Sequence, residues 1–224
     1  MIHYVCKYTP VELFRGFGEE CAVLEEMPEN FEQSDQIAHA NLCGFGKSVI
    51  QAVLEGKADQ LVLVNCCDSM RRVYDIVEST GKCKFLYMLD MPHEDNDCEK
   101  VKLAQGIHRL KKAYEKFSGK TFDRSGFLNA FSHEPVDNQP YIGVLGVRVS
   151  GILEKMIRDN IRMDVENLTC TGGRRLAVIR EELEKMEDDA MFLAYADALL
   201  SQMPCFRMNN STRRNRLYLD PNLK

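Results

Sequence analysis

Several features that are missing from this sequence exclude common classes of protein. It has no apolar run approaching 18 residues and no secretory signal, since Met1 leads directly into a segment that reads as folded. It also lacks an excess of positive charge, because its formal net charge is -5. We therefore expect a cytoplasmic protein, with no nucleic acid and no membrane among its partners.

Two kinds of motif are absent as well. No Cys-x-x-Cys pair occurs, which disfavours zinc-ribbon and ferredoxin-type sites. No glycine-rich phosphate fingerprint follows the first expected strand, which disfavours a flavin or dinucleotide binder. Gly46-Lys47-Ser48 precedes an expected helix, but Asn41 stands where a phosphate-binding loop requires glycine. A nucleotide site at this point is therefore disfavoured.

Cysteine, in contrast, is plentiful. The chain has nine cysteines, at positions 6, 21, 43, 66, 67, 83, 98, 170 and 205. Their spacing is irregular and their number is odd, so a complete disulfide framework is not expected. Reduced thiols that bind a metal or an iron–sulfur cluster are the better prediction, while the remaining cysteines pack in the core.

The order of apolar and polar segments predicts an α/β fold. Short apolar runs read as strands at 2–6, 21–25, 60–65 and 84–89, and helical patterns follow them, among them 70–79 and 98–118. Strands that alternate with helices favour a doubly wound parallel sheet of the Rossmann or flavodoxin kind. The polar segment 28–35 is predicted to be a loop.

Residues 132–140 carry two prolines and several polar side chains, and we interpret them as a domain boundary. A first α/β lobe would span residues 1–134, and a second would span 135–224. Strands are predicted in the second lobe at 141–145 and 161–165 only. Because two strands seldom make an independent sheet, the second lobe is expected to be incomplete.

Four cysteines occupy positions that favour chemistry. Cys66 and Cys67 follow the apolar strand 60–65 directly and precede Asp68 and a helix. Ligands of open α/β sheets bind at such carboxyl ends of strands. Cys43 lies in a glycine-containing turn before a helix, where an anion is favoured, although an ordinary loop cysteine is the alternative. Cys170 again lies in a glycine-containing turn after a strand.

Six segments together resemble a known family in their order and spacing. They are residues 8–18, 43–48, 65–74, 89–93, 167–174 and 204–208. They resemble the 2-hydroxyacyl-CoA dehydratase group, which includes the 2-hydroxyglutaryl-CoA dehydratase D-component, benzoyl-CoA reductase subunits and double-cubane cluster proteins. The resemblance implies consecutive α/β lobes with an iron–sulfur cluster, [4Fe-4S] or double-cubane, in the cleft between them.

The resemblance also implies cysteine ligands for that cluster. Cys43 and Cys67 match its first two ligand positions, which leaves Cys66 without a role. Cys170 and Cys205 match second-lobe positions whose part in ligation varies among relatives. A late cysteine of the family has no counterpart here. We therefore expect either a fragment or split subunit, or a cluster completed by Cys170, Cys205, Cys21 or a partner.

The activity implied by the resemblance is that of a lyase of anaerobic metabolism. An ATP-dependent activator protein would supply one electron, and a 2-hydroxyacyl-CoA would lose water by a radical route to give a 2-enoyl-CoA. The partner would be a homologous subunit in a heterodimer or homodimer. Arginines 174, 207, 213 and 214 either meet CoA phosphates or lie on the solvated surface. A double-cubane reductase of small molecules and a cluster-free scaffold lobe remain alternatives.

Overall fold

The computed structural model describes residues 1–25, 27–92, 94, 96–131, 133, 140–144, 149, 151–170, 172, 174 and 176–202. The chain divides into two compact units, which we call unit 1 (residues 1–90 and 110–127) and unit 2 (residues 91–109 and 128–224). The predicted domain boundary, between residues 134 and 135, falls within residues 134–139, which lie outside the described part of the chain. That boundary stays a prediction.

Unit 1 contains a parallel sheet of four strands. They are β1 (Ile2–Tyr4), β2 (Cys21–Val23), β3 (Gln60–Val64) and β4 (Phe85–Leu89). Their order is β2-β1-β3-β4, and every neighbouring pair is parallel. This is the beginning of the flavodoxin-like order, in which the direction of winding reverses between β1 and β3. The predicted α/β class and parallel sheet are confirmed.

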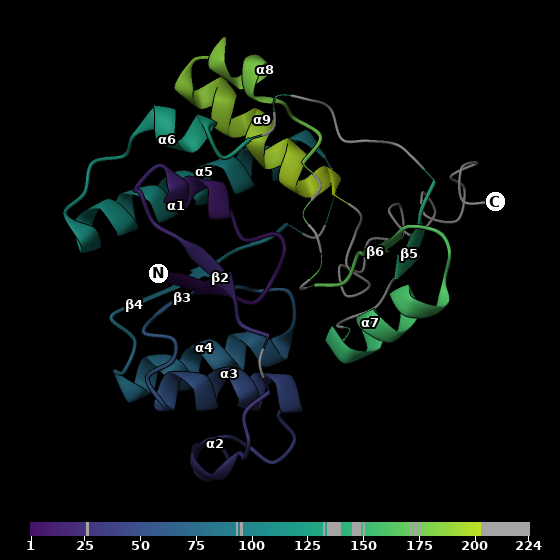
Figure 1. Cartoon of the computed structure of the whole chain (residues 1–224). Coiled ribbons are helices and arrows are strands. Elements are labelled where there is room, and N and C mark those ends of the chain that lie inside the picture. The colour runs from purple at the N-terminus through teal and green to yellow at the C-terminus, as the bar shows by residue number, and fades with distance from the viewer. Residues whose placement is uncertain are drawn as a thin grey trace. The chain divides into compact units, whose positions relative to one another are not determined.

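The helices of unit 1 cover the two faces of this sheet (Figure 1). Those that lie wholly within it are α1 (Val11–Arg15), α2 (Glu32–Ile37), α3 (Gly44–Leu54) and α4 (Asp68–Thr80). The crossover from β1 to β2 runs in one direction along the sheet, and the crossovers from β2 to β3 and from β3 to β4 run in the opposite direction. Because each crossover is right-handed, α1 lies on one face of the sheet and α3 and α4 lie on the other. No described helix is both long and apolar enough to cross a bilayer.

The core of unit 1 is built on β3. Leu61, Val62, Leu63 and Val64 are all fully buried, as expected for a strand with helices on both faces. An aromatic cluster packs on the α1 side of the sheet, where the ring of Tyr114 lies 5.1 Å from that of Phe14 and 5.0 Å from that of Phe85. These contacts hold α1 and β4 against Tyr114.

Helices α5 (Asp97–Ser118) and α6 (Arg124–Leu128) each contribute residues to both units, and unit 2 adds a second parallel pair of strands. Its strands β5 (Ile142–Val144) and β6 (Val165–Asn167) are joined through α7 (Gly151–Asn160). The predicted range 161–165 for the second strand was wrong, since β6 begins only at Val165. Two further helices, α8 (Arg180–Glu184) and α9 (Asp188–Ser201), follow.

Helix α9 packs within unit 2 against the first half of α5 and the residues after α6. The ring of Phe192 lies 4.3 Å from that of His108, and the ring of Tyr195 lies 5.4 Å from that of Phe131. Lys100 Nζ is 2.8 Å from the Asp197 carboxylate. These contacts join residues far apart in the sequence into one unit.

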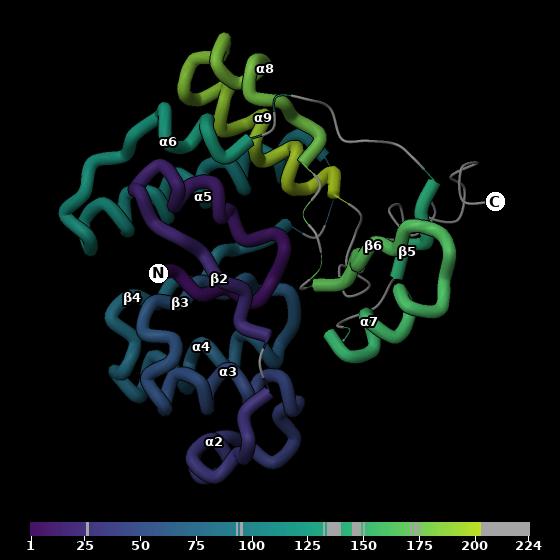
Figure 2. The backbone as a smooth tube through the Cα atoms, viewed as in Figure 1, coloured from purple at the N-terminus to yellow at the C-terminus, as the bar shows by residue number. Residues whose placement is uncertain are grey.

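The prediction of a loop at 28–35 was wrong, because α2 begins within this segment. Figure 2 follows the chain from β2 through this short helix into α3. The Glu32 amide donates to Asn30 Oδ1 (3.1 Å), and the Ser34 amide donates to Gln51 Oε1 of α3 (2.9 Å). The second bond is buried and comes from 17 residues away, so local sequence does not reveal it. A tertiary contact therefore caps this helix.

We expect Gln51→Leu to destabilise unit 1 by about 1–3 kcal/mol, because the buried Ser34 amide would lose its acceptor. The matched control is Gln33→Leu on α2, where the side chain is exposed and the change should stay within about 0.5 kcal/mol. Urea unfolding followed by circular dichroism measures both. Equal losses in the two variants would contradict the capping role of Gln51.

Candidate functional site

Cys43 is the N-cap residue of α3. Its backbone is extended, with φ -62° and ψ 148°, and its Sγ accepts a hydrogen bond from the Gly46 amide at 3.4 Å. The side chain is half-buried. Unpaired amides and the positive end of the helix dipole favour an anionic group at this point. Cys43 is thus a half-buried thiol at a helix start, and its part in ligation stays a prediction.

Cys67 is the N-cap residue of α4 and follows β3 through a short turn. Its backbone is extended, and its carbonyl accepts hydrogen bonds from the amides of Met70 (3.1 Å) and Arg71 (3.3 Å). Its side chain makes no capping hydrogen bond and is half-buried, as is that of Cys66. The sulfur of Cys67 is therefore not committed to capping the helix that it begins.

Helices α3 and α4 lie side by side and both begin at the carboxyl edge of the sheet (Figure 1). Gly46 allows them to approach closely, since a Cβ at this position would lie 3.1 Å from Val73 Cγ2 of α4. It would also lie 3.2 Å from Leu42 Cγ. The fold therefore brings Cys43 and Cys67 to the same edge, on the first residues of two packed helices.

The turn with Cys66 and Cys67 is fixed to the neighbouring strand by Asn65. The Asn65 side chain donates to Asp90 Oδ1 at 2.8 Å, and its backbone amide donates to the Leu89 carbonyl at 3.2 Å. Both acceptors lie at the carboxyl end of β4. The sequence did not lead us to a role for Asn65. Its position, as an amide side chain between a predicted strand and a cysteine, could have indicated one.

An open concavity of about 740 Å³ adjoins this turn. Its lining includes Asn65, Asp68 and Asp90 together with Arg71 and Arg72 of α4. Arg71 lies 3.8 Å from Asp68, and both side chains are largely exposed, so this ion pair adds little stability. The surface beside Cys67 is thus polar and of mixed charge.

The phosphate-loop alternative at Gly46-Lys47-Ser48 finds no support in the structure. Lys47 Nζ forms an ion pair with Asp35 Oδ1 at 2.7 Å, and the Ser48 hydroxyl donates to the Gly44 carbonyl at 2.9 Å. Lys47 therefore links α3 to α2, and Ser48 bonds within α3. The polar groups that a nucleotide would need already serve the fold.

Cys170 lies in unit 2, in a tight turn after β6, and is buried. Asn167 Oδ1 accepts hydrogen bonds from both the amide (3.1 Å) and the hydroxyl (2.6 Å) of Thr169. The turn closes where the Gly172 amide donates to the Thr169 carbonyl at 3.2 Å. A Cβ on Gly172 would lie 1.9 Å from the Asn167 carbonyl oxygen, so only glycine fits.

Asn167 also ties this turn to α7. Its side-chain amide donates to Glu154 Oε2 at 2.8 Å. Hydrogen bonds from Arg158 and then Asn167 lower the pKa of the Glu154 carboxyl, so this acceptor is ionised at neutral pH. The role of Asn167 was also missed from the sequence, although the residue lies three positions before Cys170.

Other cysteines differ from these in their surroundings. Burial raises the pKa of Cys83 to about 11, so this residue is a protonated thiol at neutral pH. Cys6 is buried, and Cys98 is exposed near the start of α5. Cys205 lies outside the described residues, as do His93, Arg207, Arg213 and Arg214; Arg174 is described and half-buried.

Of the cysteines predicted as ligands, Cys43 and Cys67 therefore lie at one edge of unit 1, Cys170 lies in unit 2, and Cys205 lies outside the described residues. Over the described part of the chain, no group of three or more His, Cys, Asp or Glu side chains is arranged to hold a metal ion. Ligation of a cluster by Cys43 and Cys67 therefore stays a prediction.

We expect Gly46→Val to destabilise unit 1 by about 1–3 kcal/mol, because Val73 and Leu42 leave too little space for the added methyl groups. Gly44→Val is the matched control, since nothing lies within 4 Å of a Cβ at Gly44 and the change should stay within about 1 kcal/mol. Thermal unfolding compares the two. A Gly46 variant as stable as its control would refute the close contact between α3 and α4.

Gly172→Ala should open the turn around Cys170 and cost about 3 kcal/mol, because the added methyl group meets backbone atoms of Asn167. Gly151→Ala, at an unobstructed position that begins α7, serves as the control. Iodoacetamide labelling read by mass spectrometry should modify Cys170 faster in the Gly172 variant only. Unchanged labelling would show that the turn tolerates a side chain.

A family model described as 2-hydroxyglutaryl-CoA dehydratase, D-component, matches residues 6–135. The matched region contains Cys43 and Cys67 and ends before Cys170. No curated protein matches the chain.

Proposed function

The chain belongs to the 2-hydroxyglutaryl-CoA dehydratase D-component family, and on this premise we propose that it is the iron–sulfur subunit of a 2-hydroxyacyl-CoA dehydratase. The observation that carries the proposal is the placement of Cys43 and Cys67 at the first residues of two packed helices, at the carboxyl edge of the sheet. Both thiols are half-buried, so a ligand at this edge would be partly shielded from water.

In this proposal Cys43 and Cys67 hold an iron–sulfur cluster, and Cys170 and Cys205 are candidates for its further ligands. A bound cluster supplies low-potential one-electron chemistry tuned by its surroundings. Among the surrounding groups, the Gly46 amide donates to Cys43 Sγ, and the start of α3 would favour a bound anionic group. Asn65, through Asp90, holds the Cys67 turn in place.

The net reaction of the proposed enzyme is the loss of water from a 2-hydroxyacyl-CoA to give a 2-enoyl-CoA. The hydroxyl group leaves from carbon 2 and a proton leaves from carbon 3, so the reaction consumes no net electrons. One electron, delivered by a partner that hydrolyses ATP, would serve as a catalyst and be returned. A homologous subunit would complete the enzyme, and the compartment would be the cytoplasm.

The test is anaerobic purification of the full chain followed by iron and acid-labile sulfide analysis. Wild-type protein should hold about four irons for one [4Fe-4S] cluster. Cys43→Ser and Cys67→Ser should each lose at least half of this iron, whereas Cys98→Ser, at an exposed position on α5, should keep it. Circular dichroism of each variant verifies that the fold is retained.

Three outcomes separate this proposal from its alternatives. Near-zero iron in folded wild-type protein would exclude the cluster, and co-purification with a homologous subunit would then favour a scaffold role. Equal iron in all four proteins would exclude Cys43 and Cys67 as ligands. About eight irons for each chain would favour a double-cubane reductase, for which Cys66 beside Cys67 offers an additional half-buried thiol.

A further inference from the structure

The sheet of unit 1 has an open edge at β4. The strand order β2-β1-β3-β4 ends there, so no described strand pairs with the outer side of β4. The Asn65 amide donates to the Leu89 carbonyl, which therefore faces the side of β3. Because alternate residues of a parallel strand direct their backbone groups to opposite sides, Leu86 and Met88 direct theirs to the open edge. These amides and carbonyls are placed to pair with a further strand.

The side chains of this edge are apolar and accessible. Leu86, Tyr87 and Met88 are each half-buried, and the concavity of about 740 Å³ reaches the last two of them. Phe117 of α5 packs against Phe85 and is 41% exposed. The strand itself carries no proline and no charged residue, which are common protections of a sheet edge. An edge of this kind favours association with another chain.

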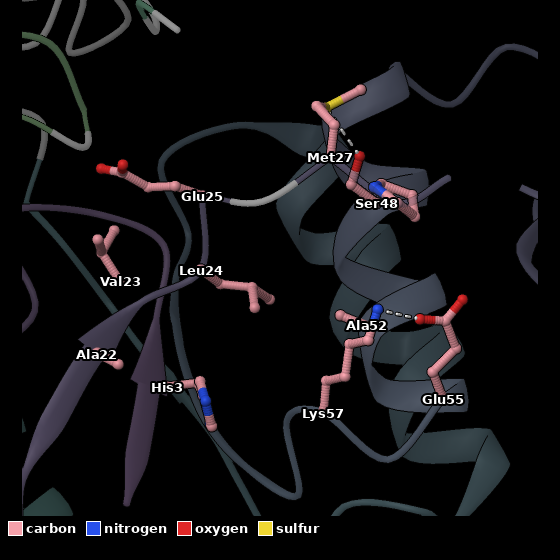
Figure 3. A pocket seen from close by; sticks show the side chains of 11 residues that line it. His3, Ala22, Val23, Leu24, Glu25, Met27, Ser48, Ala52, Glu55 and Lys57 are labelled. Atoms are coloured by element: carbon pink, nitrogen blue, oxygen red, sulfur yellow. Dashed lines mark hydrogen bonds and ion pairs between the residues drawn. The ribbon is translucent and has the colours of Figure 1, made fainter. Parts of the chain in front are cut away.

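The opposite edge of the sheet, at β2, differs from β4 in length and in charge. Strand β2 has three residues, and the exposed side chains of Glu20 and Glu25 flank it. Figure 3 shows the pocket beside its end, where Glu25 and Leu24 point in opposite directions. Antiparallel pairing of two β2 strands would bring Glu20 of one copy close to Glu25 of the other, and like charges oppose such pairing. Of the two edges, β4 is thus the better suited to a second copy.

The charges at the two ends of β4 are complementary to each other about a two-fold axis. Lys84 directly precedes the strand, Asp90 directly follows it, and both are exposed. In an antiparallel pair of β4 strands centred on Tyr87, Lys84 of one copy lies opposite Asp90 of the other. Lys84 Nζ also lies 2.7 Å from Asp59 Oδ2 of its own copy. Exposed ion pairs of this kind therefore set the register of the pairing more than its affinity.

We propose that unit 1 binds a second copy of this chain by antiparallel pairing of β4 with β4, about a two-fold axis at Tyr87. Leu86 of one copy then lies opposite Met88 of the other, so both edge residues gain backbone hydrogen bonds. The contact uses the same surface on both copies, so it closes with two chains. The inference goes beyond the proposed dehydratase, since it needs neither iron nor an acyl-CoA.

The first test is sedimentation equilibrium of the full chain under reducing conditions, from about 1 to 100 μM, a range suited to a small interface. We expect a reversible equilibrium between monomer and dimer. Tyr87→Lys places like charges opposite each other at the two-fold axis and should weaken the dimer about fivefold more than Tyr87→Thr, the uncharged control. A monomer at every concentration, or equal dissociation constants for the two variants, would overturn the proposal.

A crosslink tests the register of the pairing. The two copies of Tyr87 would lie directly opposite each other with Cα atoms about 4.5 Å apart, within the span of a disulfide. Tyr87→Cys should therefore form a disulfide between chains on mild oxidation, identified by mass spectrometry. Leu86→Cys is the control, because its two copies would lie more than about 7 Å apart.

The crosslink also decides the matter if Tyr87→Lys fails to fold, which circular dichroism would reveal. A disulfide between the introduced thiols of Tyr87→Cys, with little or none in Leu86→Cys, supports the proposed pairing. Equal yields in the two variants, or no crosslink in either, would refute it. The native cysteines are the same in both variants, so any disulfides that they form cancel in the comparison.

Discussion

The constraint on which the site of unit 1 depends is that all strands of its sheet run in one direction. Parallel pairing places the carboxyl ends of β1, β3 and β4 at one edge of the sheet. A helix that connects one parallel strand to the next must therefore begin near that edge. Cys43 and Cys67 are far apart in the sequence, yet each is the first boundary residue of such a helix. Their placement at one edge follows from the topology.

Close packing then fixes the positions of α3, α4 and the Cys67 turn at this edge of the sheet. Gly46 removes the side chain that would separate α3 from α4, and Asn65 fastens the Cys67 turn to the end of β4. Unit 2 uses the same elements in its own turn, where Asn167 organises the backbone before Cys170 and Gly172 permits the close approach. In both units an asparagine and a glycine fix the position of a cysteine.

Much of this fold was predictable from the sequence, because its strands are continuous apolar runs between polar turns. The strand β3 and the positions of Cys43 and Cys67 before helices follow from such local patterns. Helix α2 was missed because Gln51, distant in the chain, supplies its cap. The complete ligand set could not be predicted either, since it depends on which distant side chains meet, and Cys205 lies outside the described residues.

The hydrogen bond between Asn65 and Asp90 has a mechanical consequence. Asp90 is the last residue of unit 1 before the chain passes into unit 2 at Met91. The residue that holds the Cys67 turn is therefore the last one of unit 1 before this junction. The backbone conformation at the junction and the position of the Cys67 turn are thus coupled through one side-chain hydrogen bond.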